Sequence, residues 1–181
     1  MGGGRGRKPR NLILVNLSEQ AFLEAVATHQ AILHKVCRIY CDSPEDRRDL
    51  LQEMLLQLWR AWPGFREEAR VSTWMYRIAL NTAISDLRKR QRQPQTEEIE
   101  AAAFLPEMEA ALSLESQEQT LFLREAIRQL SSVEKAIVML YLESHSYEEI
   151  AEIIGITPTH VGVKLNRIRR HLSKIIKPHF S

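Results

Sequence analysis

The sequence predicts an all-α protein of two small helical domains joined by an acidic linker. Glycine and proline are sparse, with seven of each among 181 residues. Apolar residues recur at spacings of three and four through most of the chain, as they do on one face of an amphipathic helix. Charge is segregated along the chain although the net charge is only +2. The predicted divisions are a basic tail at 1–17, a first domain at 18–93, the linker at 94–120 and a second domain at 121–177.

Composition and targeting signals narrow the class of protein. With 44% hydrophobic and 27% charged residues, the chain has the balance of a globular protein. The longest apolar run, 136–142, is far shorter than the roughly 20 residues of a membrane-spanning helix, and the run 12–15 is too short for a secretory signal. We therefore expect a cytoplasmic protein without membrane insertion. The only cysteines, Cys37 and Cys41, suit a reducing compartment.

The first domain is expected to begin with two amphipathic helices. Ser18 can cap the first, whose apolar stripe is Phe22, Val26, His29, Leu33, Val36 and Tyr40. Ser43 followed by Pro44 is a start signal for the second, because proline lacks only an N–H that would be unpaired there anyway. This helix should run to about Trp62 and stop at Pro63. Its predicted apolar stripe is Leu51, Leu55, Leu58 and Trp62, beside an acidic and amide-rich edge of Asp46, Asp49, Gln52 and Glu53.

A third helix is predicted after a loop that holds Phe65, Arg66 and Arg70. Ser72 can cap it, and its core side is expected to be Tyr76, Leu80, Ala83 and Leu87. The opposite face carries Trp74, Arg77, Asn81, Ser85, Arg88 and Arg92. Nucleic acid favours this mixture, since cations neutralise phosphates and aromatic rings stack on exposed bases. An ordinary solvated face with a half-buried tryptophan is the alternative.

The linker is the most acidic part of the chain. Between Gln95 and Thr120 there are seven glutamates and no lysine or arginine. Basic residues flank it, from Arg88 to Arg92 on one side and over 160–177 on the other, where six lysines or arginines and no acidic residue occur. One interpretation of this pattern is two basic modules joined by an acidic segment. Charge alone is equally compatible with three ordinary solvated surfaces.

The second domain has the layout of a helix-turn-helix. Ser131 with Glu134 and Ser146 with Glu149 form capping boxes, and Thr157 precedes a proline, so helices should begin at about 132, 147 and 158. A short turn containing Gly155 separates the last two helices. The residues expected to face inward are Tyr147, Ile150, Ala151 and Ile154, then Val161, Leu165, Ile168, Leu172 and Ile175.

The last helix leaves a basic and polar face outward. That face consists of Thr159, Val163, Asn166, Arg167, Arg170 and Lys174, side chains of the types that contact base edges or phosphates. It favours DNA binding over a helix pair that never touches DNA. Gly162 lies in the first turns of this helix at a cost of about 1 kcal/mol relative to alanine. Either it lets the backbone approach a phosphate or it is simply tolerated.

Together the two modules resemble the sigma factors of the sigma-70 family, in the small extracytoplasmic-function (ECF) group that keeps only regions 2 and 4. The strings that carry the resemblance are DRRDLLQEMLLQLW at 46–59, FREEARVSTWMYRIALNTAISDLRKR at 65–90 and the helix-turn-helix at 146–172. The resemblance implies two all-helical domains that bind core RNA polymerase and promoter DNA and direct transcription initiation. It calls for no cofactor.

The resemblance also assigns roles to residues of this chain. The segment that binds the clamp helices of core polymerase matches at Asp46, Asp49, Leu50, Gln52, Glu53, Leu56 and Trp59. The surface for the minus-10 element, including the loop that captures a flipped base, matches at Phe65, Arg66, Arg70, Trp74, Arg77, Asn81, Arg88 and Lys89. The minus-35 reader matches at Thr159, His160, Val163, Lys164, Asn166, Arg167 and Arg170.

The sequence differs from the family pattern at some positions, and the resemblance also suggests further contacts. Leu80 and Ser85 stand where many relatives have an arginine and an aspartate, with Asp86 one position late, and such changes shift which promoter is read. By resemblance the acidic linker runs through the basic RNA-exit region of the polymerase. Many relatives are held by an anti-sigma factor, which makes such a factor a further candidate partner.

Other classes of function find less support in the sequence. His34, Cys37 and Cys41 lie on one helical face, but without an evident fourth ligand they favour core and rim positions over a metal site, so none is assigned. No constellation of nucleophile, base and orienting group can be assembled, so the chain is not expected to be an enzyme. The remaining rivals are a helix-turn-helix regulator that binds DNA without polymerase, and a protein that sequesters another factor through its apolar helices.

Overall fold

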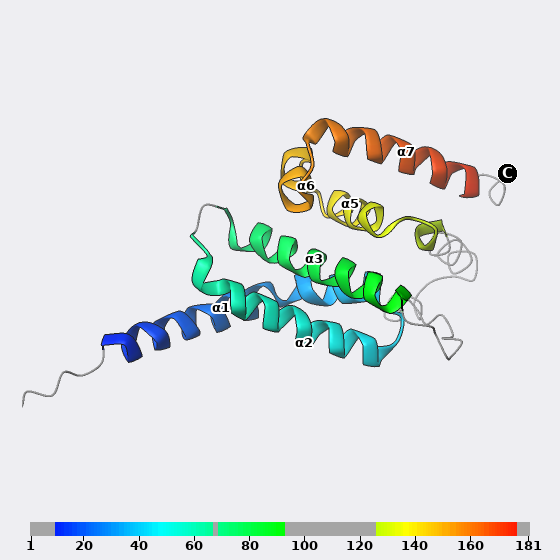
Figure 1. Ribbon diagram of the computed structural model, residues 1–181. Coiled ribbons are helices and arrows are strands. Elements are labelled where there is room, and N and C mark those ends of the chain that lie inside the picture. Colours follow the sequence, from blue (N-terminus) through cyan, green and yellow to red (C-terminus); the bar gives the residue numbers. More distant parts are fainter. Residues whose placement is uncertain (1–9, 67–68, 93–125, 177–181) are drawn as a thin grey trace, which may run out of the picture.

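The computed structural model describes residues 10–66, 69–92 and 126–176, with side chains from Glu19 to Ile175 within those ranges. Its elements in chain order are α1 (Arg10–Tyr40), α2 (Pro44–Ala61), the 3-10 helix η1 (Trp62–Gly64), α3 (Val71–Arg92), α5 (Ser132–Leu142), α6 (Tyr147–Ile154) and α7 (Pro158–Ile176). The all-α prediction is confirmed over these residues (Figure 1). None of these helices is long and apolar enough to cross a membrane. Residues 1–9 of the predicted tail and the predicted linker at 94–120 lie outside the described residues.

Helices α1, α2 and α3 form a three-helix bundle. Their inner faces bury Leu33 and Val36 of α1, Leu50, Met54 and Leu58 of α2, and Met75, Ala79, Leu80 and Ala83 of α3, each at most 2% exposed. Burying a large aliphatic side chain stabilises a fold by about 1.5–3 kcal/mol, so this cluster holds the three helices together. Two alanines on α3 leave room for the neighbouring helices to approach closely.

The structure corrects three details of the first domain. Helix α1 begins at Arg10, so Ser18 lies inside it and is not its N-cap. Helix α3 begins at Val71, one residue before the predicted cap at Ser72. The fully buried stripe of α2 contains Leu50, whereas the predicted Leu51 is only partly buried. Adjacent leucines at 50–51 and 55–56 support two overlapping stripes, and periodicity alone does not choose between them.

The predicted helix starts in the two domains are otherwise confirmed by their caps. The hydroxyl of Ser43 accepts from the backbone N–H of Asp46 at 3.0 Å, with Pro44 at the first helical position. Both capping boxes form, and in the second the N–H of Glu149 donates to Ser146 Oγ at 3.2 Å. These caps satisfy N–H groups that a helix leaves unpaired at its start.

Helices α6 and α7 form the predicted helix-turn-helix. Gly155 ends α6 with φ of 79°, a left-handed conformation that glycine adopts at little cost. Ile150 and Ala151 of α6 pack inward as predicted, and so do Val161, Leu165 and Ile168 of α7. Tyr147 was predicted to face inward, but it is 39% exposed, and Ile153 is buried on this helix instead. A short helix that packs on three neighbours, α3, α5 and α7, buries a wider face than one stripe predicts.

Gly162 faces the ring of the exposed Tyr147. A Cβ at this position would meet Tyr147 Cε2 at 3.4 Å, which is a van der Waals contact without a clash. We therefore expect Gly162→Ala to stabilise the protein by about 0.5–1 kcal/mol, because alanine costs less than glycine inside a helix. Thermal unfolding measures this gain. A variant less stable than the wild type would show that the ring cannot accommodate the methyl group.

The two domains pack against each other, which the sequence did not predict. Helices α5 and α6 lie against α3 on the side away from α2 (Figure 1). Tyr40 donates to the carbonyl oxygen of Ser132 at 2.6 Å, and Tyr76 donates to the carboxylate of Glu143. The same carboxylate pairs with Lys35 Nζ at 2.5 Å. Partners more than 60 residues apart in sequence leave no local pattern, so only the structure reveals this closed arrangement.

The two cysteines are free, buried thiols at the end of α1. Burial raises the pKa of Cys37 from 9.0 to about 12, and burial also raises the pKa of Cys41 despite a hydrogen bond from Arg90. Because the thiolate is the nucleophile, we expect Cys37 in the native protein to react with iodoacetamide at pH 8 about a thousandfold more slowly than in the unfolded chain. Mass spectrometry over time measures both rates. Equal rates in buffer and in guanidinium chloride would contradict this burial.

Candidate nucleic-acid and protein interface

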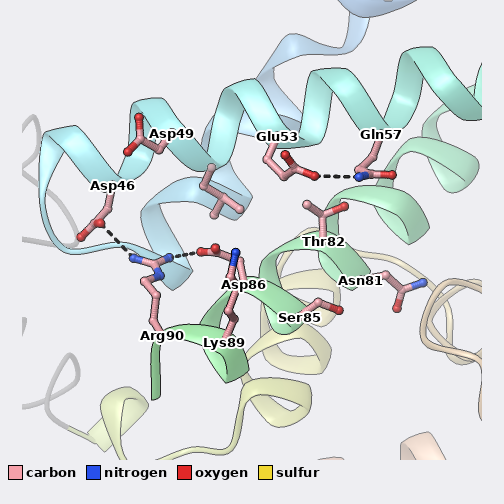
Figure 2. Close-up of a pocket in the computed structure, with 11 residues that line it drawn as sticks. Asp46, Asp49, Glu53, Gln57, Asn81, Thr82, Ser85, Asp86, Lys89 and Arg90 are labelled. Atoms are coloured by element: carbon pink, nitrogen blue, oxygen red, sulfur yellow. Dashed lines mark hydrogen bonds and ion pairs between the residues drawn. The ribbon is translucent and has the colours of Figure 1, made fainter. Parts of the chain in front are cut away.

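A polar groove of about 640 Å³ runs between α2 and α3. Figure 2 shows the acidic side chains of α2 along one edge and the polar and basic side chains of α3 along the other. The groove is lined by Asp46, Asp49, Leu50, Glu53, Gln57, Asn81, Thr82, Ser85, Asp86, Lys89 and Arg90. Residues predicted to bind two different partners, protein and DNA, therefore border one groove.

Arg90 fixes the relation between the two edges of the groove. Its guanidinium pairs with Asp46 Oδ1 at 3.2 Å and with Asp86 Oδ2 at 2.5 Å (Figure 2). It also donates to Cys41 Sγ at 3.1 Å. It thus joins the start of α2, the end of α3 and the end of α1. The sequence showed Arg90 only as part of a basic run. Its spacing of four from Asp86 was the one local signal that could have identified its role.

The predicted polymerase-binding residues of α2 divide into an exposed set and a supporting set. Asp49, Gln52 and Glu53 are exposed, and Leu56 and Trp59 are 41% and 43% exposed. Their spacings of three and four place them on one stripe of the helix. Leu50 is 2% exposed and belongs to the core, and Asp46 is held by Arg90. The structure therefore gives α2 an outer face of two carboxylates, an amide and two large apolar side chains.

An aromatic cluster fills the junction between α2 and α3. Trp62 and Phe65 stack with centroids 5.5 Å apart, and Trp74 packs against Phe65 at 5.1 Å. Phe22 of α1 contacts Trp62 edge-on at 5.6 Å and Trp59 at 5.0 Å. The sequence placed Trp74 on the outer face of α3 and left a half-buried tryptophan as the alternative; the side chain is only partly exposed, because these rings cover it. Sequence reasoning missed Phe22 and Trp62 as parts of this cluster.

A hollow of about 480 Å³ opens beside these rings. It lies between α1 and the loop that follows α2, and Trp62, Phe65 and Val71 form one wall. Arg66 and Arg70, from the same loop, are exposed. The arrangement offers flat aromatic surfaces beside exposed cations, which is the chemistry that holds an unstacked base and its phosphates.

The outer face of α3 carries the predicted cations, but α6 contacts part of it. Arg77, Asn81, Arg88 and Lys89 are exposed, as predicted. Arg77 donates through Nη2 to the carbonyl oxygen of Glu152 at 2.6 Å, and Arg70 Nη1 lies 3.7 Å from Glu149 Oε1. Two side chains expected to contact DNA thus contact the second domain in this closed arrangement.

Most of the predicted DNA-reading residues of α7 lie on its outer face. Thr159, His160, Asn166, Arg167 and Arg170 are exposed, Val163 is 42% exposed and Lys164 is partly buried. Their charge is positive, whereas the inner side of α7 is apolar. The pKa of Glu134, on the neighbouring α5, is lowered chiefly by the Ser131 hydroxyl, with smaller effects from Lys164 and His171. Helix α7 therefore presents a basic, polar ridge.

The histidine and cysteines considered as metal ligands do not converge. His34 is exposed, whereas Cys37 and Cys41 are buried. The Cys37 thiol donates to the carbonyl oxygen of Arg47 at 3.4 Å, and the Cys41 sulfur accepts from Arg90. Within the described ranges no group of three or more candidate ligands is placed to hold a metal ion.

Comparisons with known proteins agree with this division into two modules. A family model described as "Sigma-70 region 2" matches residues 25–93, and one described as "Sigma-70, region 4" matches 121–172. The "ECF RNA polymerase sigma-E factor" of Escherichia coli (strain K12) is 31% identical over 173 residues, which cover 88% of either chain. The "ECF RNA polymerase sigma factor SigM" of Mycobacterium tuberculosis is 25% identical over 177 residues, covering 97% of this chain and 88% of the relative.

Two solved structures share the fold. The sigma factor RpoE from Bartonella quintana, in complex with the anti-sigma factor NepR, matches with a TM-score of 0.63 at 24% identity, over 88% of this chain and 96% of that one. CnrH in complex with the cytosolic domain of CnrY has a TM-score of 0.63 at 19% identity, over 92% of this chain and 96% of its own. On the two region models and the sequence relatives, this chain belongs to the ECF group of the sigma-70 family.

Proposed function

We propose that this sigma factor binds core RNA polymerase through the exposed face of α2 and promoter DNA through α3 and α7, and so directs where transcription starts. The observation that supports it most is that three chemically different outer faces lie on three separate helices of one scaffold. Members of this family are non-enzymatic initiation factors, and we propose no catalytic role for this chain. We expect it to act in the cytoplasm, where polymerase and DNA are found.

The outer face of α2 has the composition of a protein interface. Leu56 and Trp59 supply apolar contact area, and Trp is among the residues that dominate interface energies. Asp49 and Glu53 beside them favour a basic partner surface and orient it. Leu50 contributes by holding α2 in place from the core. The predicted contact with the clamp helices of polymerase is consistent with this division of labour.

The aromatic cluster and the hollow beside it suit the minus-10 element. A base paired in a duplex hides its edges, so reading it requires taking it out of the stack. We propose that Phe65 and Trp62 form the wall against which such a base lies, while Arg66 and Arg70 contact the backbone nearby. Trp74 then supports this wall from α3 rather than standing free on the helix.

The ridge of α7 suits the major groove at the minus-35 element. The second helix of a helix-turn-helix enters that groove, where arginine can bind guanine and asparagine can bind adenine through two hydrogen bonds. Asn166, Arg167 and Arg170 are exposed side chains of these types on the outer face of α7, whereas the exposed Arg169 lies toward its flank. We propose that they read or position this element, with Thr159 and His160 at the end of the helix nearest the turn.

We infer that the closed arrangement opens for promoter binding, because α6 packs on α3 and takes a hydrogen bond from Arg77, one of the proposed DNA contacts. We expect dyes on Gln30→Cys and Gln129→Cys, exposed positions in the two domains, to move apart when core polymerase binds. Energy transfer between them measures the change, and the buried native thiols should stay unlabelled. An unchanged transfer efficiency in the polymerase complex would contradict the required opening.

The solved structures named above are complexes with anti-sigma factors, and we propose a partner of this class for the present chain as well. Such a partner would favour the closed arrangement if it binds both domains at once. In this proposal the anti-sigma factor sequesters the present chain. In the alternative hypothesis the present chain sequesters another factor.

Selection of bound DNA separates a sigma factor from a free-standing regulator. Genomic fragments are incubated with the protein alone, with core polymerase alone, and with both, at one salt concentration. We expect specific enrichment only with both, since each DNA-binding face is weak alone and holding both on polymerase raises their effective concentration. Equal enrichment by the protein alone would support the regulator instead.

A further inference from the structure

A second groove, of about 290 Å³, lies between α1 and α5 at the junction of the two domains. Ile39 of α1 and Ile127, Val138 and Leu142 of the second domain supply apolar lining, with Met139 beneath them. Leu142 is 72% exposed, the largest exposure among the exposed large hydrophobic residues of the described chain. An apolar groove so open to water is a candidate docking surface.

The rim of this groove is basic. Lys35, Arg38 and Lys135 line it, together with a single carboxylate, Glu143, which already pairs with Lys35 and accepts from Tyr76. The rim therefore carries more cationic than anionic side chains around an apolar floor, although Asp42 also lies close enough to Lys135 to act on its charge. The occupant that fits such a surface is a segment that is both acidic and apolar.

The chain itself supplies such a segment. Residues 95–120 hold seven glutamates and no lysine or arginine, and they also contain apolar residues, among them Phe104, Leu105, Met108, Leu112 and Leu114. This composition complements the groove in both respects, because glutamates can face the basic rim and apolar side chains can cover the floor.

The chain on either side of this segment is tied to the region where α1 ends and α2 begins. Before it, Arg90 pairs with Asp46 at 3.2 Å, and after it, Arg128 Nη2 lies 3.4 Å from Asp42 Oδ1. Asp42 lies on the turn between α1 and α2, three residues after Ile39 of the groove lining, and Asp46 lies in the first turn of α2. Ile127 is itself part of the groove lining. The segment therefore leaves and returns close to one region of the fold, and the groove is within its reach there.

We propose that the acidic segment 95–120 docks in the groove between α1 and α5 of the free protein. The groove has walls from both domains, so it exists only while they are packed together. Docking therefore favours the closed arrangement, and opening the domains releases the segment. In the free sigma factor the docked acidic segment holds the two domains together, and it becomes available for other contacts once polymerase has bound.

Carbodiimide crosslinking of the full-length monomer tests this docking, because the reagent joins a lysine amine to a carboxylate that contacts it. We expect amide links from Lys135 to glutamates of 95–120, identified by mass spectrometry. The link between Lys35 and Glu143 serves as an internal reference for the closed packing. Leu142→Ser should lower the yield of the Lys135 links about tenfold, since it removes apolar contact area from the groove floor. The matched control is Leu23→Ser, at a leucine that is 59% exposed elsewhere on α1.

Leu142 lies on the surface, so its replacement leaves the buried face of α5 intact and the reference link should persist in each variant. Higher salt should also lower the Lys135 links, since exposed charge pairs are screened. The docking is refuted if the wild-type monomer gives no links from Lys135 to 95–120, or if the Leu142 and Leu23 variants give equal yields. Links found only between two chains of a dimer would also refute it and would assign the groove to a second copy.

Discussion

Reversing two charges on α2, Asp49→Lys with Glu53→Lys, should raise the Kd for core polymerase at least about a hundredfold. Both carboxylates are exposed on the outer stripe of α2, and removing charged partners from an interface typically costs 2–5 kcal/mol. Glu53 accepts only a local hydrogen bond, from Gln57 at 2.6 Å, so the fold should tolerate the change. Titration of labelled protein with core polymerase at fixed salt measures the shift.

The matched control places the same change elsewhere. Glu19→Lys with Glu24→Lys reverses two exposed glutamates on α1, outside the proposed contact. This variant should bind polymerase within about twofold of the wild type, because distant surface charges are largely screened. If both double variants weaken binding equally, the effect comes from net charge and α2 is not the contact surface.

Removing two arginines from α7, Arg167→Ala with Arg170→Ala, should weaken binding of the polymerase complex to its promoter about a hundredfold. A base contact by arginine is worth about 1–3 kcal/mol of binding free energy. Loss of a phosphate contact reduces the slope of log K against log salt concentration by about one. Measuring affinity on a selected promoter fragment at several salt concentrations separates these two roles.

Arg169→Ala is the control within the same helix. Arg169 is exposed, but it lies roughly 100° around the helix from Arg170, toward the flank rather than the outer ridge. We expect its replacement to change promoter affinity by less than about threefold, since an exposed charge off the contact face contributes little. If it weakens binding as much as the double variant, α7 acts through its overall charge and does not present a specific face.

Local signals in the sequence predicted much of this fold. Three helix starts are fixed by hydrogen bonds that span three residues, at Ser43 before Pro44 and at the two serine–glutamate capping boxes. The residues that form the sequence pattern are the residues that make these hydrogen bonds, so the pattern predicts the contact directly. The exposed ridge of α7 was predictable for a similar reason, because a highly amphipathic helix separates its faces by periodicity. The order of the two modules then carried the family assignment.

Contacts distant in sequence were not predictable in this way. Trp74 has the spacing of a solvent-facing residue on α3, and only the arrival of Phe65 and Trp62 covers it. Leu50 and Leu51 satisfy the same apolar pattern, and the packing of α1 and α3 decides which is buried. The hydrogen bonds from Tyr40 to Ser132 and from Tyr76 to Glu143 join the two domains without any local trace.

Transcription from a pool of genomic fragments tests the central claim most directly. Purified core polymerase is supplied with or without the wild-type protein at fixed salt, and the 5′ ends of the transcripts are mapped. The account predicts new, defined start sites that require the protein and disappear with the Asp49→Lys, Glu53→Lys variant. Absence of new start sites, with polymerase active on control templates and the protein still bound to DNA, would contradict its role as a sigma factor.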